Sequence, residues 1–122
     1  AGKEIRPRQH AVGFECVDVN LIFGMPGQHP GDAASDAARC LVIGVEQVSA
    51  YQLFTFDHTP LGRHRALPSC GERERSKAER LLRKACEAGG LARTSPWNYT
   101  RPGVAPYSTV TRENYVGFGV GA

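Results

Sequence analysis

The stretch from Cys16 to Gln28, CVDVNLIFGMPGQ, constrains the fold more strongly than any other part of the chain. Residues 17–23 are rich in β-branched and large apolar side chains, which predicts a buried strand. The sequence GMPG that follows is typical of a turn and ends the strand. Asp18 and Asn20 interrupt the apolar run two residues apart, so a strand places both side chains on the same face.

These two polar side chains need hydrogen-bond partners, because burying an unpaired polar group costs free energy. A ligand at the carboxyl end of the sheet is one such partner. An internal polar network is the other. The residues of this strand alone leave both interpretations open.

Helical and extended patterns alternate along the rest of the chain. Alanines recur at helical spacing before Gly44, and the segment VEQVSAYQLF is rich in strand formers. Ser69 and Glu72 match the capping-box pattern at the start of a second helical segment, which Gly89-Gly90 ends. In chain order we expect a helix at 32–43, a strand at 45–54, a loop at 55–68, a helix at about 71–88, a strand at 91–99 and a short strand at 107–110.

This order of strand, helix, strand, helix and strand indicates an α/β fold with parallel strands covered by helices. Three or four such strands make up only part of a (β/α)₈ barrel, which typically needs about 250 residues. The chain has 122 residues, so we expect a single domain. That domain is either a small open α/β unit or part of a larger barrel.

Composition argues against several classes of partner. The longest apolar run is about six residues, far short of the roughly 20 that a membrane span needs. The net charge of +3 is mild, and the basic residues are interleaved with Glu, so we expect a solvated surface and no nucleic-acid or membrane partner. The four cysteines, at positions 16, 40, 70 and 86, have no metal-binding spacing and demand no disulfide, so we expect no metal site and a cytoplasmic protein.

Four blocks of sequence carry a family resemblance: VNLIFGMPGQ (19–28), VSAYQLFTFDHTPLG (48–62), RTSPWNYTRPG (93–103) and YVGFGVGA (115–122). In order and spacing they resemble the radical S-adenosylmethionine enzymes related to oxygen-independent coproporphyrinogen III oxidase. The resemblance covers roughly residues 13–122. Within that group, residues 94–122 are most similar to the branch thought to open haem anaerobically by methyl transfer.

The resemblance implies a partial or full (β/α) barrel, with a [4Fe-4S] cluster bound by a CxxxCxxC loop after the first strand. In this family the cluster reduces S-adenosylmethionine to a 5′-deoxyadenosyl radical, which attacks a tetrapyrrole. The chain has no such closely spaced cysteines. The resemblance therefore implies that residues 1–122 are the middle and later barrel strands, with the N-terminal cluster-binding part and the C-terminal part absent. The implied cofactors are S-adenosylmethionine and, in the full-length enzyme only, the cluster.

The resemblance also implies site residues. Asn20 stands where the family has an Asp that contacts the ribose of S-adenosylmethionine, so it keeps the hydrogen-bonding capacity but not the charge. We expect Asp18, on the same face, to compensate. The residues that match the family's cofactor pocket are Asp18, Asn20, Tyr51, Gln52 and Phe54, and those that match its glycine-rich strand end are Gly117, Gly119 and Gly121.

Some residues have both a functional and an ordinary interpretation. Asp57 and His58 suggest an acid-base pair, although a loop histidine is more often simply exposed. Trp97 and Tyr99 are expected on one face of the third strand, where they either pack in the core or stack on a porphyrin.

Three arginines, Arg93, Arg101 and Arg112, either pair with propionate carboxylates or are solvated. No residue is assigned a catalytic role.

Two functions follow from the resemblance. The first is part of a radical S-adenosylmethionine enzyme that acts on a tetrapyrrole, either coproporphyrinogen III oxidase-like or a haem ring-opening methyltransferase, and is catalytically incomplete alone. The second is a haem- or porphyrin-binding module without radical chemistry, like the haem-chaperone branch. The sequence leaves open whether the chain is an enzyme. The expected partner in either case is a tetrapyrrole, haem or coproporphyrinogen.

Overall fold

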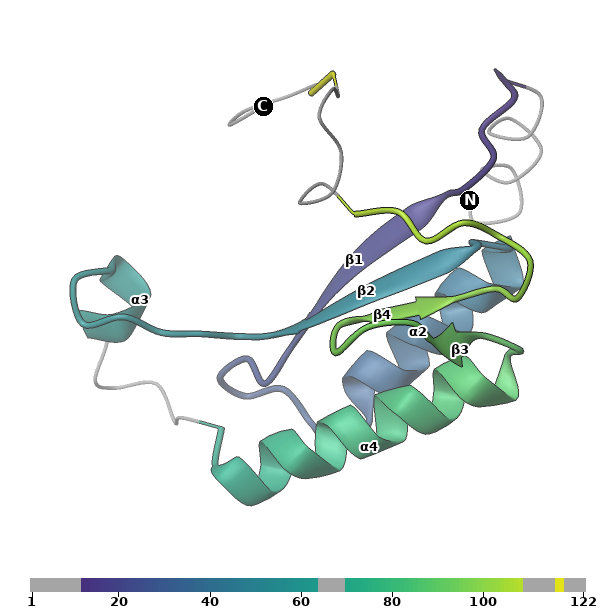
Figure 1. Ribbon diagram of the computed structural model, residues 1–122. Helices are drawn as coiled ribbons and strands as arrows, with labels where there is room; N and C mark the ends of the chain where they lie inside the picture. The colour runs from purple at the N-terminus through teal and green to yellow at the C-terminus, as the bar shows by residue number, and fades with distance from the viewer. Residues whose placement is uncertain (1–11, 64–69, 109–115, 118–122) are drawn as a thin grey trace.

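Two neighbouring strands of the four-stranded sheet are parallel (Figure 1). The computed structural model describes residues 12–63, 70–108 and 116–117. β1 (Asp18–Phe23) and β2 (Gln47–Gln52) pair along their whole length, from Asp18 opposite Gln47 to Phe23 opposite Gln52. The predicted first strand and its parallel partner are therefore confirmed, although β2 is shorter at both ends than the expected 45–54.

The turn after β1 is closed by the side chain of Gln28, the last residue of the GMPGQ sequence. Gly24 and Gly27 adopt φ values of +80° and +75°, which favour glycine. The side-chain oxygen of Gln28 accepts hydrogen bonds from the backbone N–H groups of Gly24 (2.8 Å) and Met25 (3.2 Å). The predicted turn is confirmed, and Gln28 fixes its shape.

α2 (Asp32–Ile43) connects the two parallel strands and has the predicted bounds. The Asp32 carboxylate accepts a hydrogen bond of 2.8 Å from the backbone N–H of His29, just before the helix. At the other end Gly44 is left-handed, with φ +84°, and its N–H donates to the carbonyls of Cys40 and Leu41. The glycine predicted to end this helix therefore caps it.

α4 (Glu72–Ala88) is the second long helix, and its start differs from the prediction. The residue that precedes the helix is Gly71, and its backbone N–H donates to the Glu74 carboxylate at 3.1 Å. The predicted capping box of Ser69 and Glu72 is therefore wrong, because the helix begins at Glu72 and leaves Glu74 in the position that reaches back. Ser69 itself lies outside the described residues.

The expected third strand is a hairpin. β3 (Ala92–Arg93) and β4 (Asn98–Thr100) pair antiparallel, and β4 also pairs antiparallel with β2, giving the sheet order β1-β2-β4-β3. The prediction of one strand at 91–99 in an all-parallel sheet is wrong. The turn between β3 and β4 is too short for a parallel return, which needs a crossover of a dozen or more residues. The Ser95 hydroxyl holds this turn by accepting from the N–H groups of Trp97 and Asn98.

Two further expectations need correction. The segment after β2, expected to be loop over 55–68, contains the short helix α3 (Pro60–Arg63), which lies beyond the carboxyl end of β2 (Figure 1). Proline is well suited to the first position of a helix, since its missing N–H is not needed there. Of the short strand expected at 107–110, the described residues Tyr107 and Ser108 are not in a strand, and 109–110 lie outside the described residues.

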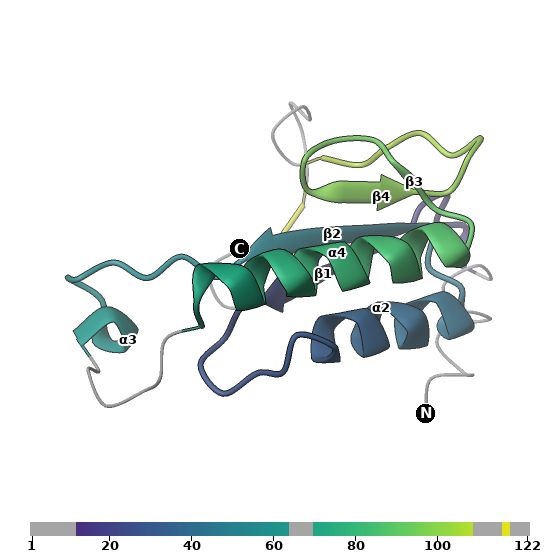
Figure 2. The ribbon, with the colours of Figure 1, turned by 90° about the horizontal axis from the view of Figure 1, so that it is seen from below.

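Both long helices cover the same face of the sheet (Figure 2). Apolar side chains of the strands and helices meet there and form the core: Phe23, Ala33, Ala37, Cys40, Val45, Val48, Ala50, Ala78, Leu82, Cys86, Leu91 and Tyr99. Burial raises the pKa of the Cys86 thiol to about 12, so this cysteine behaves as a small apolar core residue. No helix of the described residues covers the other face, which is called the open face below.

Replacement of Leu82 by Ala tests this core. Leu82 is fully buried between α4 and the sheet, so Leu82→Ala should lower the free energy of unfolding by about 2–5 kcal/mol. Val42→Ala is the matched control: Val42 lies on α2 but is 76% exposed, and its loss should change stability by less than about 0.5 kcal/mol. Urea denaturation followed by circular dichroism measures both, and equal effects would contradict the assignment of the buried face.

Candidate functional site on the open face

Side chains of β1, β2 and β4 form transverse rows across the open face. In register, the first row is Asp18, Gln47 and Thr100, and the second is Asn20, Ser49 and Asn98. A third row, nearest the carboxyl ends of the parallel strands, contains Ile22 and Tyr51, with Trp97 stacked on Tyr51. We call the first two the polar rows and the third the aromatic row. The prediction that Asp18 and Asn20 share a face is confirmed.

Asp18 belongs to an internal network. The Ser49 hydroxyl lies 2.8 and 2.9 Å from the two carboxylate oxygens of Asp18 and donates to them. Burial raises the pKa of the Asp18 carboxyl above its usual value, and the hydrogen bond from Ser49 partly offsets this. The carboxylate is therefore occupied by its neighbours within the sheet.

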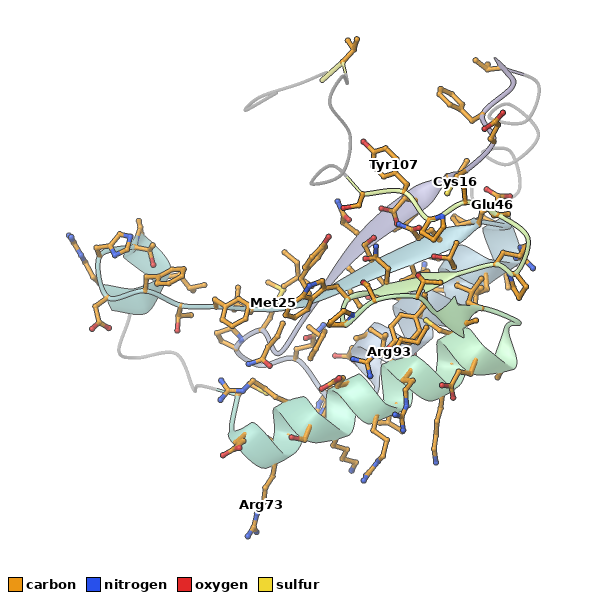
Figure 3. The ribbon with its side chains drawn as sticks, viewed as in Figure 1. Cys16, Met25, Glu46, Arg73, Arg93 and Tyr107 are labelled. Carbon is orange, nitrogen blue, oxygen red and sulfur yellow. The ribbon has the colours of Figure 1, made fainter. Side chains whose placement is uncertain are left out.

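Gln47 extends this network to the segment 104–108, which crosses the open face and is called the strap below. Gln47 is fully buried. Its amide donates to the carbonyl of Tyr107 (2.8 Å) and accepts from the N–H of the same residue (2.9 Å). The Thr100 hydroxyl donates to the same amide oxygen at 3.0 Å. Figure 3 shows Tyr107 on the side of the sheet away from α4. The Gln47 side chain thus pairs with the strap as another strand would.

Asn98 lies beneath the strap in the second polar row. Its amide nitrogen lies 3.4 Å from the Tyr107 carbonyl, a long hydrogen bond. Within the described part of the chain, its side-chain oxygen is a buried polar atom with no hydrogen-bond partner. Because unpaired buried acceptors are uncommon, this atom marks a place where a donor is expected.

Asn20 differs from its neighbour on β1. Its side chain is exposed, and it makes no hydrogen bond to any of the residues that the structure describes. It lines an open pocket of about 520 Å³ together with Asp18, Ser49, Tyr51, Thr94, Ser95, Pro96, Trp97, Asn98, Pro106, Tyr107 and Ser108. Of the two interpretations open for this pair, the internal network describes Asp18, whereas Asn20 remains available to a ligand.

The aromatic row forms one wall of the same pocket. Tyr51 and Trp97 stack with ring centroids 6.3 Å apart and an angle of 24° between the ring planes. Both rings stay well exposed, at 40% and 46%. Trp97 lies in the turn before β4, whereas Tyr99 lies within β4 and is buried in the core. Both residues line a second, smaller hollow on the helix-covered face, so core packing describes Tyr99 but not the exposed Trp97.

Gln52 and Phe54 lie away from this pocket. Alternation along β2 places Gln52 on the helix-covered face, where it lines a second, smaller hollow with Phe23, Ala50 and Leu82. Phe54 follows the end of β2 and is 61% exposed. The structure therefore brings Asp18 and Asn20 together but does not bring the side chains of Gln52 and Phe54 to them. Their roles at the cofactor stay predictions.

Of the glycines predicted to lie at the cofactor, Gly117 is exposed, and Gly119 and Gly121 lie outside the described residues. Arg112, considered for propionate binding, also lies outside them. Asp57 and His58 are both exposed, and the His58 ring stacks on Phe56.

Two arginines considered for propionate binding are held by the fold. The Arg93 guanidinium donates to the carbonyls of Ser95 (3.2 Å) and Pro96 (2.9 Å) and lies 3.6 Å from the Glu79 carboxylate. Arg101 donates to the carbonyl of Val45 at 3.3 Å. Neither side chain is on the pocket wall, so the geometry gives no support to propionate binding by these two residues.

Metal binding has no candidate among the residues that the structure describes, since no three His, Cys, Asp or Glu side chains gather there. In the same residues, no helix has the length and apolar character needed to cross a membrane.

Sequence reasoning missed Gln47, Ser49 and Asn98. A signal was present: polar residues alternate in QVSAYQ, at 47, 49 and 51, and again in NYT, at 98 and 100. Period two in a strand assigns such residues to one face. The apolar residues between these positions, such as Val48 and Ala50, give the stronger strand signal and mask the polar one.

The buried Asp18 carboxyl should make stability depend on pH. Its pKa in the folded state is raised above 3.8, so the folded state holds this proton more tightly than the unfolded chain does. The resulting stabilisation is present below pH 3.8 and is lost as the pH rises through the raised pKa. Asp18→Asn removes the titration. The unfolding free energy of the variant, minus that of the wild type, should increase between about pH 3.5 and 7 in urea titrations. Asp36→Asn, an exposed change on α2, is the control. A decrease over this range would contradict the pKa direction.

Gln47 should hold the strap. Leu is similar in size to Gln but cannot make the two hydrogen bonds to the Tyr107 backbone. Gln47→Leu should therefore lower the free energy of unfolding by about 1–3 kcal/mol and speed hydrogen exchange of the Tyr107 amide. Gln52→Leu, at the end of the same strand, is the matched control and should leave that amide unchanged. Identical exchange of the Tyr107 amide in the wild type and in Gln47→Leu would show that Gln47 does not hold the strap through these hydrogen bonds.

Comparison with known proteins gives relatives of much greater length. No family model matches the chain. The chain is 29% identical over 124 aligned residues to "Heme chaperone HemW" of Bacillus subtilis, and 28% identical over 123 to the protein of that name in Lactococcus lactis. Each alignment covers 94% of this chain but only 32% of the relative, so the chain spans about a third of their length.

A solved structure shares the fold. Coproporphyrinogen III oxidase (HemN) from Escherichia coli, described as a radical SAM enzyme, matches with a TM-score of 0.69 and 16% sequence identity. The match covers 82% of this chain and 24% of that protein. The sequence relatives and the shared fold together confirm the resemblance predicted from the sequence, to the radical S-adenosylmethionine proteins of the coproporphyrinogen III oxidase-like (HemN-like) family.

Proposed function

We propose that this chain forms the S-adenosylmethionine-facing part of a radical S-adenosylmethionine protein that handles a tetrapyrrole. The observation that carries the proposal is Asn20: its amide is exposed on the open face, without a partner among the described residues, at the position that the family resemblance assigns to the ribose contact. The relatives and the shared fold support the same family.

The residues around Asn20 fit a nucleoside. The amide of Asn20 can both accept from and donate to ribose hydroxyls. Asp18 supports it from the adjacent position on the same face, where Ser49 keeps the carboxylate oriented. An Asn in place of the family's Asp provides hydrogen bonds without a negative charge, so binding is expected to be weaker than with a carboxylate. When bound and reduced, S-adenosylmethionine supplies a 5′-deoxyadenosyl radical.

The described residues do not fit a [4Fe-4S] cluster, because no group of three potential ligands gathers among them. We propose that its ligands belong to the part of the barrel that precedes β1, with this chain as the middle and later strands. No step through the cluster is derived from this chain. The cytoplasmic location expected from the cysteine pattern is part of the same proposal.

A second candidate is favoured by the names of the two sequence relatives, both called heme chaperones. In that case the protein would bind haem and pass it on without radical chemistry. The oxidase-like and methyl-transfer reactions are the enzyme forms of the first proposal. Stoichiometric haem binding without consumption of S-adenosylmethionine would favour the chaperone, and turnover of a tetrapyrrole would favour an enzyme.

Substitution of Asn20 tests the cofactor role. Calorimetric titration of the chain with S-adenosylhomocysteine, a stable analogue, should show binding that Asn20→Ala weakens about tenfold, since a lost hydrogen bond costs about 1 kcal/mol or more. Asn20→Asp should bind as tightly as the wild type or more tightly. Ser35→Ala, an exposed change on α2, is the control. Clear weakening by Asn20→Asp would mean that Asn20 is not at the ribose position.

A further inference from the structure

We propose that the outer face of α4 is a docking surface for a partner protein that presents a row of carboxylates. This face lies on the opposite side of the helix from the buried Ala78, Leu82 and Cys86, so it belongs neither to the core nor to the candidate site on the open face. Its exposed cations are called the basic stripe: Arg73, Lys77, Arg80 and Lys84. The inference goes beyond the proposed function and does not depend on it.

The basic stripe is a line of positive charge along the helix. Its members follow one another at intervals of four, three and four residues. At 3.6 residues per turn, this spacing places them within an arc of about 60° around the helix and over about 16 Å along it. Figure 3 shows Arg73 pointing away from the sheet. Among the residues that the structure describes, no member of the stripe forms an ion pair, so its charge is available to a partner.

Helix stability does not account for the basic stripe. Like charges three or four residues apart destabilise a helix, and every neighbouring pair along the stripe is of this kind. Arg73 lies in the first turn, where the positive end of the helix dipole disfavours a cation. A solvated helix face more typically alternates charges of opposite sign. A row of carboxylates on a partner would supply the missing negative charge.

Most glutamates of α4 interact with groups outside the stripe. Glu74 accepts a hydrogen bond of 3.1 Å from a backbone N–H at the start of the helix. The carboxylate of Glu79 lies 3.6 Å from the Arg93 guanidinium, and that of Glu87 lies 3.9 Å from Arg83. The helix therefore contains acidic residues but uses them elsewhere, and the charge of the stripe stays uncompensated.

A hollow beside the stripe offers an anchor for one carboxylate. It has a volume of about 200 Å³ and is lined by Ser76, Glu79, Arg80 and Arg83. The charge of Glu79 is partly neutralised by Arg93, which lies beside it. The two guanidinium groups and the serine hydroxyl of this hollow can all donate hydrogen bonds to a carboxylate. A Glu or Asp side chain of a partner would meet complementary groups there.

The surroundings of the stripe favour a protein over a phosphate-bearing partner. Glu72 and Glu74 lie on either side of Arg73, each about 100° away around the helix. The broad negative surface of a nucleic acid or an anionic membrane would approach these carboxylates, whereas a single row of side chains would pass between them. All residues of α4 are described, and none of its large apolar side chains is exposed, so the helix offers no group for insertion into lipid.

A peptide of matching charge tests the proposal. The probe is a labelled synthetic helix with glutamates at intervals of four, three and four residues, a pattern that is the same in both directions. Fluorescence anisotropy should show binding that weakens as salt increases. Arg80→Glu combined with Lys84→Glu should weaken binding about tenfold or more. The control, Arg39→Glu combined with Arg63→Glu, makes the same change in net charge at exposed positions outside α4 and should weaken binding much less. Circular dichroism confirms that each variant is folded.

Four results would overturn the inference. Equal weakening by the two double variants would show that only the net charge matters. Equal binding of the glutamate helix and of the same helix with glutamines, or no binding by the folded wild type, would show that the stripe does not receive carboxylates. Tighter binding of a short DNA duplex or of phosphatidylserine vesicles than of the peptide, lost in the stripe variant, would show that phosphates are the ligand of this face.

Discussion

The parallel pairing of β1 with β2 is the constraint on which the rest of the structure depends. Once Asp18 lies opposite Gln47, every later residue of both strands is assigned to a face. Val19, Leu21 and Phe23 then join Val48 and Ala50 under the helices, and the polar residues between them turn to the open face. A slip of one residue would bury Asp18 and Asn20 among the helices. The register between β1 and β2 therefore fixes both the core and the candidate site.

Polar side chains on the open face serve two different purposes. Asp18, Ser49, Gln47 and Thr100 hydrogen-bond to one another and to the strap, so that their burial is largely compensated. Asn20 stands at the edge of this network and is exposed. The amide of Asn20 thus lies beside a network whose polar groups are already hydrogen-bonded. This arrangement favours binding, since the supporting groups do not need to reorganise when a ligand arrives.

The antiparallel hairpin of β3 and β4 changes what the open face can hold. β4 lies between β2 and β3, where a simple succession of parallel strands would have placed β3 itself. This insertion brings Asn98 beside Ser49 and Trp97 against Tyr51. A side chain of the hairpin turn thus becomes a wall of a pocket whose floor belongs to strands about fifty and eighty residues earlier in the chain.

By itself, the sequence determined the elements whose signals are local. The apolar run before GMPG, the alanine spacing ended by Gly44, and the pairing of Asp18 and Asn20 on one face depend on neighbours in the chain, and the structure has all three. Only the tertiary structure decided the direction of β4 and the separation of Gln52 from Asn20. It also decided which polar residue is satisfied and which is available. These outcomes depend on contacts between residues far apart in sequence, such as Gln47 with Tyr107, which no local pattern specifies.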